Sequence, residues 1–347
     1  MKPESSETRP YVPSFLDRFM DFIEWQSIPY WLTYLLLFFL QGLIMHTLAW
    51  IVGWLPAFRF NAILFVFPLW QWGPLGLMTH LNRVALEALA DFSPLLDADE
   101  KRLERLKFEF TVMPARSVIL SGVIWSIIYL GLTYLAFKAF YVDYQLGTFF
   151  GGVMIVEGLI SYATGSAIYY HSFRQLWLVN QTVKMVRQFD LFWLNPVYAF
   201  SRVTSQIGMA WMVMLSLTLL LFPIKLATAP VLVILALQVL LAVAAFVLPL
   251  MFVNRRLVFE KRRLLAEHNQ RLEATLERLH GYLDWKEPEL AAQLNSAVAG
   301  LSLERTVLTG IPTWPWRTTT LTTFLSTLGI PIIIFLIQLL IKKLLGV

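Results

Sequence analysis

The sequence predicts an all-α fold: a polytopic transmembrane helix bundle of about seven spans, with a cytoplasmic amphipathic helical hairpin. Three observations predict it: the composition, a series of long apolar stretches, and the places where Lys and Arg gather. Hydrophobic residues make up 57% of the 347 residues and charged residues 15%, whereas a typical soluble domain has about 25% charged residues. The mean hydropathy is +0.62. Because a water-soluble fold needs a polar outer shell, we expect lipid to be the outer solvent of this protein.

Seven apolar stretches are long enough to cross a bilayer. A hydrocarbon core of about 30 Å needs about 20 helical residues, since each rises about 1.5 Å. The stretches that qualify are 30–54, 60–80, 117–140, 148–170, 204–225, 230–253 and 319–341. The second contains Pro68, Gly73 and Pro74, which predict a kink or a break. We therefore expect seven spans, with a re-entrant segment at 60–80 as the alternative.

Lys and Arg are distributed unevenly between the two sides of these spans. If the N-terminus is inside, only five of the 28 Lys and Arg residues lie outside: Arg59, Lys138, Lys225, Lys342 and Lys343. The positive-inside rule therefore places the N-terminus in the cytoplasm and the C-terminus outside. The mixed charges before the first span do not fit a signal peptide. The expected location is a plasma membrane, such as the inner membrane of a bacterium.

The spans divide the chain into four parts. These are a cytoplasmic N-terminal segment 1–28, six spans in 29–253 with cytoplasmic loops 81–116 and 171–203, a cytoplasmic helical hairpin 254–318, and a final transmembrane helix 319–347. The first loop predicts two helices around a turn at Ser93-Pro94. The second mixes basic and aromatic residues, which suits a helix lying at the membrane surface. In the hairpin, Leu recurs at helical spacing, with a kink expected at Pro249 and a turn near Gly281–Pro288.

An aromatic corner, Trp314-Pro315-Trp316, lies between the hairpin and the last span. Tryptophan at the boundary between membrane and water commonly anchors a span, which is the simpler interpretation. The functional interpretation is a joint that transmits a movement of the hairpin to the last span. The sequence leaves both open.

Glu157 is the only acidic residue expected inside a span, about ten residues or about 15 Å from its start. A carboxylate near the bilayer centre is costly and usually faces a polar interior. It therefore predicts an ion or proton site, or a charge that lines a pore. The alternative is a protonated Glu157 that bonds to Gln41, His46 or Gln238 on other spans. The same span has glycines that allow close helix approach and leave room beside the carboxyl, among them Gly158 and Gly165.

The last span is polar along one side, at Thr323, Ser326, Thr327 and Gln338. Such a helix can face water or a symmetry mate in an oligomer, so these four residues and Glu157 are the candidates for a pore or ion pathway. The alternative is ordinary packing of polar side chains within the bundle.

No pattern in the sequence predicts an enzyme. The chain has no Cys and five His residues that form no metal-binding motif, and it has no Gly-rich phosphate loop. No acid, base and nucleophile converge in the pattern. We expect no catalytic residue, no metal and no cofactor. The net charge of +5 follows from the topology and does not indicate nucleic-acid binding.

The predicted layout resembles that of insect gustatory and odorant receptors, which have seven helices, the N-terminus inside and the C-terminus outside. The shared features are the span order, the hairpin and the polar last span, where Gln338 follows five hydrophobic residues, 333–337. That family's last span carries Thr-Tyr, five hydrophobic residues, Gln and Phe. Pro331, Ile332 and Leu339 stand here where Thr, Tyr and Phe are expected. The resemblance implies a homo-oligomeric cation channel, assembled through the hairpins, whose last helix lines the pore.

These observations favour an oligomeric ion channel or receptor-like channel, with a small molecule as a conceivable ligand. Two alternatives stay open. One is a non-conducting scaffold or sensor whose hairpin binds a cytoplasmic protein. The other is an ion- or proton-coupled transporter that uses Glu157 as its coupling site.

Overall fold

The computed structural model describes residues 10–139, 148–186, 190–221, 229–284 and 288–345, and this part of the chain is built from helices. The N-terminal helices are α1 (Phe15–Trp25), α2 (Tyr30–Ile51), the 3-10 turn η2 (Ala62–Phe65), α3 (Val66–Phe92), η3 (Ser93–Leu95), α4 (Glu100–Thr111) and α5 (Ala115–Ala139). The C-terminal helices are α6 (Phe149–Lys184), α7 (Asn195–Leu221), α8 (Ala229–Val247), η5 (Leu248–Leu250), α9 (Met251–Asp284), α10 (Pro288–Gly310) and α11 (Thr318–Leu345).

Six helical stretches of the described residues are long and apolar enough to cross a membrane. They are Tyr30–Ile51, Ala62–Leu95, Phe149–Lys184, Asn195–Leu221, Leu235–Asp284 and Thr318–Leu344. A shorter apolar stretch, Ala115–Gly131, belongs to α5. The chain is therefore an all-helical, multi-pass membrane protein.

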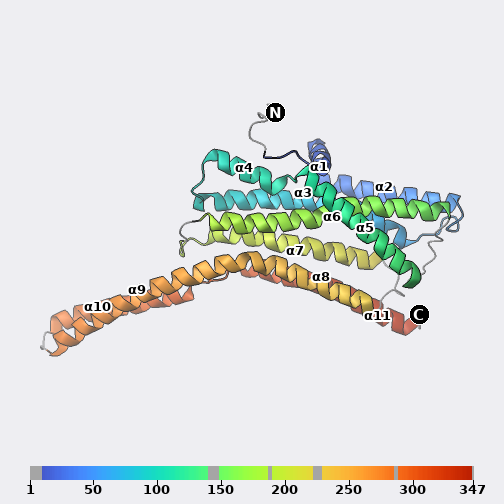
Figure 1. Cartoon of the computed structure of the whole chain (residues 1–347). Helices are drawn as coiled ribbons and strands as arrows, with labels where there is room; N and C mark the ends of the chain where they lie inside the picture. The colour runs from blue at the N-terminus through green and yellow to red at the C-terminus, as the bar shows by residue number, and fades with distance from the viewer. Residues whose placement is uncertain (1–9, 140–147, 187–189, 222–228, 285–287, 346–347) are drawn as a thin grey trace.

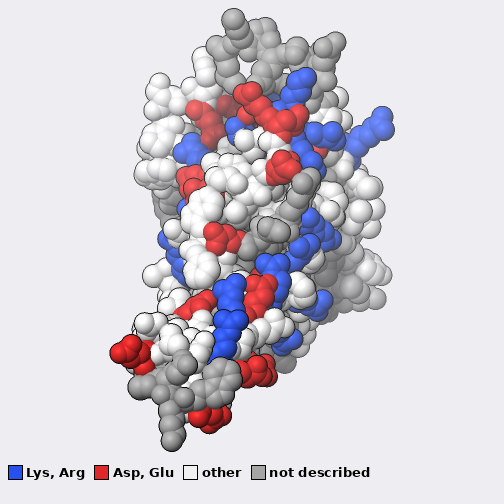
Figure 2. Space-filling view, turned by 90° about the vertical axis from the view of Figure 1, so that its left-hand side faces the viewer, with Lys and Arg blue, Asp and Glu red and all other residues white. Residues whose placement is uncertain are grey.

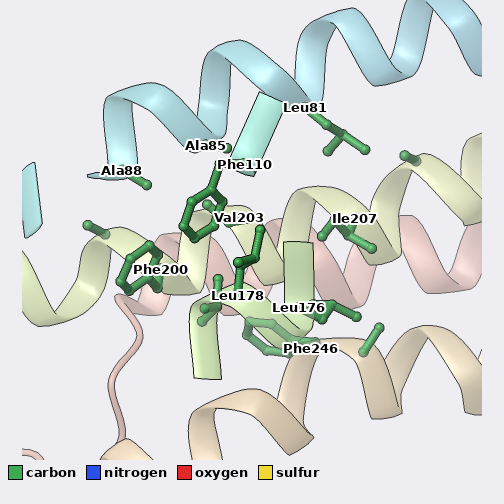
Figure 3. Packing of buried hydrophobic residues seen from close by; sticks show 14 of the residues in the cluster. Leu81, Ala85, Ala88, Phe110, Leu176, Leu178, Phe200, Val203, Ile207 and Phe246 are labelled. Atoms are coloured by element: carbon green, nitrogen blue, oxygen red, sulfur yellow. The ribbon is translucent and has the colours of Figure 1, made fainter. Parts of the chain in front are cut away.

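Helix α7 is the centre of the bundle, because 61% of its most apolar stretch is buried. It packs against α3, α8 and α11, while α3 also contacts α2 and α6. Figure 3 shows the core between these helices, where small residues of α3, such as Ala85, leave room for the rings of Phe110 and Phe200. Those two rings lie stacked, with centroids 6.0 Å apart. The core therefore joins the apolar helices to α4, which carries Phe110.

Helices α9 and α10 form a hairpin that projects from one end of the bundle (Figure 1). Pro249 lies in η5, which separates α8 from α9, as expected for a residue that interrupts the helical ladder. Helix α9 ends at Asp284 and α10 begins at Pro288, and the residues between them, where the sequence predicts a turn, lie outside the described residues. Helix α11 then returns along α8 and α7, as Figure 1 shows.

Of the kink or break predicted for the second span, the structure excludes a break. Helix α3 runs unbroken through Pro74, whose missing N–H leaves the carbonyl of Trp70 without its usual donor. Gly165 of α6 lies against that carbonyl, and a Cβ there would come within 2.5 Å of the oxygen. Pro68 costs little, because it stands in the first turn of α3, where helical N–H groups have no partner.

Two further expectations are wrong. Residues 171–184 form no separate surface helix, because α6 continues through them and buries much of its last turns. Gly158 and Gly165 do not make room beside Glu157. A Cβ at Gly158 would meet the ring and hydroxyl of Tyr129 at 2.1 Å, and Gly165 faces α3, so both serve helix packing.

Candidate functional site

Glu157 belongs to a cluster of four partly buried polar side chains, which we call the Glu157 cluster: Gln41 of α2, Gln71 and Trp72 of α3, and Glu157 of α6. The amide nitrogen of Gln41 donates to Gln71 Oε1 at 2.8 Å and to Glu157 Oε1. The indole N–H of Trp72 donates to the amide oxygen of Gln41. Gln41 therefore connects the other three, and three separate helices meet at this carboxyl.

The Glu157 cluster is made entirely of bonds between side chains. No described Lys or Arg forms an ion pair with Glu157. A carboxyl in such a place can hold and release a proton, or accept a cation whose hydration shell the amide oxygens partly replace. The arrangement is chemically suited to ion or proton binding.

The other two predicted partners of Glu157 bond elsewhere. His46 Nδ1 lies 2.8 Å from the carbonyl of Gly42, and its Nε2 accepts the N–H of Asn61 at 3.1 Å. Its ring also stacks on Phe60. Gln238 donates to the hydroxyl of Tyr169 at 3.3 Å. Of the three candidates, only Gln41 reaches the carboxyl.

The polar residues of α11 divide into internal and outward-facing ones. Gln338 donates to the carbonyl of Leu219 near the end of α7, where helical carbonyls lack internal donors. The hydroxyl of Thr327 returns to the carbonyl of Thr323 at 2.9 Å. The buried residues of α11 are Phe324, Leu328, Pro331 and Phe335; Ser326 is exposed on the opposite face, and Thr323 is exposed at the edge of that outward face.

The hydroxyls of Thr323 and Ser326 form no hydrogen bond within the described part of the chain. Further along the same face, Ile330, Ile333 and Ile337 are 45%, 58% and 52% exposed. The outward face of α11 therefore presents the free hydroxyls of Thr323 and Ser326, followed by a row of isoleucines.

The aromatic corner is packed against the bundle. The indoles of Trp314 and Trp316 stack with centroids 4.4 Å apart, and Trp316 stacks on Phe246 of α8 at 5.1 Å. Phe246 in turn contacts Phe324 of α11 at 4.5 Å. Pro315, which stands between the two tryptophans in the sequence, is buried. An aromatic chain thus leads from the corner into α11.

Helix α9 holds the corner from the other side. Lys261 donates to the carbonyls of Thr309 and Ile311, each at 2.7 Å, and Asn254 donates to Thr313 at 3.0 Å. These carbonyls lie in the last turn of α10 and just after it, so α9 side chains cap the end of that helix. A displacement of the hairpin would act directly on the corner.

A second polar cluster, which the sequence did not predict, lies at the end of α4; we call it the α4 clamp. Four side chains satisfy the carbonyls of residues 109–112. Arg174 donates to Glu109 and, at 2.7 Å, to Val112; Gln175 donates to Phe110 at 3.0 Å; Asn82 donates to Thr111 at 3.1 Å; and Tyr11 donates to Val112 at 2.9 Å. The clamp thereby fixes α4 to α3 and α6.

The segment before α1 joins the same clamp. The Asp17 carboxylate accepts the backbone N–H groups of Ser14 and Met113, at 3.0 and 2.9 Å, and the Ser14 hydroxyl at 2.7 Å. Burial raises the pKa of Asp17 above its ordinary 3.8, although these donors oppose the shift. Burial likewise raises the pKa of Tyr11 to about 12. The polar run His171, Arg174, Gln175 on α6 was the only sequence signal for the clamp.

Comparison with known proteins gives no match: no protein-family model, no curated protein and no solved structure matches this chain. Its function must therefore be argued from the geometry and chemistry of these sites.

Proposed function

We propose that this chain is one subunit of an oligomeric ion channel, with seven spans, the N-terminus in the cytoplasm and the outward face of α11 lining a central pore. The observation that carries the proposal is the pair of free, exposed hydroxyls of Thr323 and Ser326. In lipid, a Ser or Thr hydroxyl normally bonds back to its own helix. Thr322 and Thr327 do so.

A pore explains the free hydroxyls better than lipid does. Around a symmetry axis, Thr323 and Ser326 of each copy would meet water and permeant ions, which supply the missing hydrogen-bond partners. Ile330, Ile333 and Ile337 would then form a narrow apolar section, and such a section can close by dewetting. The most apolar stretch of α11 is only 22% buried within one chain, which leaves its surface for neighbouring copies.

The aromatic corner would serve as the gating link in this proposal. Lys261 and Asn254 tie the corner to α9, and Trp316 with Phe246 ties it to α8 and, through Phe324, to α11. A movement of the hairpin would therefore change the position of α11.

The test is ion flux in liposomes that contain the purified full-length protein. The variant Thr323→Val/Ser326→Ala removes the two free hydroxyls, and we expect it to reduce flux by about tenfold or more, the effect of about 1.4 kcal/mol in a permeation barrier. The matched control is Thr327→Val on the same helix, whose hydroxyl bonds back and which lies nearer the buried face, and it should keep its flux. A protein that is monomeric in the bilayer and leaves liposomes sealed would contradict the proposal.

A second candidate, an ion- or proton-coupled transporter, is favoured by the Glu157 cluster. That cluster involves α2, α3 and α6, whereas α11 packs on α7 and α8. Uptake driven by a pH gradient and abolished by Glu157→Gln, with α11 variants unaffected, would favour the transporter. Sealed, inactive liposomes together with a soluble protein that binds the hairpin would favour a scaffold.

A further inference from the structure

One face of α9 carries a basic and aromatic cluster where the helix leaves the bundle. Successive helical residues are turned by about 100°, so five side chains share one third of the circumference: Phe252, Arg255, Arg256, Phe259 and Arg262. The cluster begins directly after η5, which ends the apolar α8. It therefore lies next to the point where the chain leaves the apolar span.

Lys184, in the last turn of α6, extends this cluster. Its Nζ lies 6.0 Å from the ring centroid of Phe252, and the guanidinium carbon of Arg256 lies 5.5 Å from the same centroid. Two cations thus share one aromatic ring, which attracts both while they repel each other. An anion from outside the chain would relieve this repulsion.

Three of the Arg charges on this face are not neutralised by any residue that the structure describes. Arg255, Arg256 and Arg262 form no ion pair with any residue that the structure describes. Arg263, next along the helix, behaves differently and pairs with Glu260 at 3.0 Å and with Glu267 at 3.6 Å. Arg255, Arg256 and Arg262 thus leave three unpaired cations on the face that turns away from the α10 side of the hairpin, where Arg263 is the Arg that has carboxylate partners among the described residues.

An exposed aromatic ring lies between the unpaired cations. Phe259 is 63% exposed and stands one helical turn from both Arg255 and Arg262. Leu248, just before the cluster, is 61% exposed. Aromatic rings interleaved with Arg are typical of surfaces that sit at the boundary between headgroups and acyl chains.

The same face becomes acidic farther from the bundle. Glu273 and Glu277 occupy it about 17 and about 23 Å beyond Arg262, and both are exposed. Figure 2 looks at the molecule from the side of the hairpin and shows Lys and Arg side chains following one another from the bundle into the hairpin, with acidic ones around its end. The change of sign along one face indicates a negative partner close to the membrane, because a partner in free solution would give no reason for this gradient.

We propose that the base of α9, together with Lys184, binds the phosphate-bearing headgroup of an anionic phospholipid. The Arg255, Arg256 and Lys184 cations would contact the phosphate, Arg262 would add its positive charge beside them, and Phe259 and Leu248 would rest against the upper acyl chain. This site requires only that α8 crosses the membrane, and it is independent of whether the protein conducts ions.

The test is native mass spectrometry of the full-length protein in mild detergent, with phosphatidylglycerol or phosphatidylcholine of identical acyl chains. The wild type should retain phosphatidylglycerol preferentially. Arg255→Gln/Arg262→Gln should weaken its retention by about 30-fold, from the usual contribution of each Arg near an anionic surface. The matched control is Arg271→Gln/Arg278→Gln, which removes two exposed charges about 24 Å farther along α9. It should retain the lipid as the wild type does.

Three results would overturn the inference. Equal retention of the two lipids by the wild type would exclude headgroup recognition, and this comparison needs no variant that folds. Equal losses in both double variants would indicate net charge alone. If inorganic phosphate displaced phosphatidylglycerol while the ionic strength was held constant, the site would be one for free phosphate and not for lipid. Thermal unfolding of each variant checks that its fold is intact.

Discussion

The α4 clamp and the Glu157 cluster share helix α6, about 26 Å apart along its axis, and their hydrogen bonds end on different kinds of acceptor. In the clamp, Arg174 and Gln175 donate to main-chain carbonyls of α4. In the Glu157 cluster, every bond joins two side chains.

This difference shows which polar side chains the fold itself needs and which it does not. The last carbonyls of a helix have no internal donors, and a buried carbonyl without a partner costs about 1–3 kcal/mol. Since α4 ends at Thr111 with Val112 and not a glycine as its C-cap, the clamp is what allows this end to be buried. The Glu157 cluster completes no backbone group, so apolar side chains could replace it without leaving an orphaned carbonyl. Its polarity therefore needs a functional explanation.

The largest effect should come from Arg174→Ala, which removes the donor to Glu109 and Val112 and a partner of Tyr11. We expect a loss of about 3 kcal/mol or more in the free energy of unfolding, because hydrogen bonds to charged groups contribute about 1.5–3 kcal/mol each. Denaturant or thermal unfolding in detergent measures it.

The matched control is Arg105→Ala on α4. Arg105 is largely exposed and forms an i,i+4 ion pair with Glu109 at 2.9 Å, so its loss should cost about 0.3–0.5 kcal/mol. If the two variants lost similar amounts, the clamp would not be the main attachment of α4.

A smaller effect, visible in its pH dependence, should come from Asp17. Its pKa is raised in the folded protein, so the folded state holds the proton more tightly than the unfolded chain. The stability that this proton contributes is fully present below about pH 4 and is lost as the pH rises through the folded pKa. We expect Asp17→Asn, which keeps an oxygen acceptor for Met113, to remove this loss. The melting temperature of the variant, relative to that of the wild type, should then increase by a few degrees as the pH rises to neutral.

Melting curves across that pH range test this expectation, with Asp284→Asn at the exposed end of α9 as the control. If the melting temperature of Asp17→Asn instead fell further below that of the wild type as the pH rose, the ionised carboxylate would be the stabilising form.

Local patterns predicted the helices well, because leucine spacing and proline placement act within a few residues. Helix α9 ends and α10 begins within the range where the sequence predicts the end of one helix and the start of the next, and Pro249 lies in a 3-10 turn where the sequence predicts a kink. The break expected in α3 failed for a reason outside that segment. The carbonyl that Pro74 leaves free faces Gly165, whose position on another helix no local pattern specifies.

The sites depend even more on distant contacts. Tyr11 and Arg174 are 163 positions apart, and no composition or periodicity links them. For Glu157 the sequence supplied the depth in the bilayer and three polar candidates. Depth does not say which helices are neighbours, so only the structure distinguishes Gln41 from His46 and Gln238.

The smallest effect on stability should come from Glu157→Gln, the variant that most directly tests the comparison. Glutamine has nearly the same shape and still offers an oxygen to the amide of Gln41. Because no backbone group depends on the carboxyl, we expect the free energy of unfolding to change by less than about 1 kcal/mol. Any pH dependence of flux or uptake that comes from this carboxyl should disappear, since the amide cannot titrate. Unfolding and transport must be measured on the same preparations. A loss of stability as large as that of Arg174→Ala, with transport unchanged, would mean that the Glu157 cluster is structural as well.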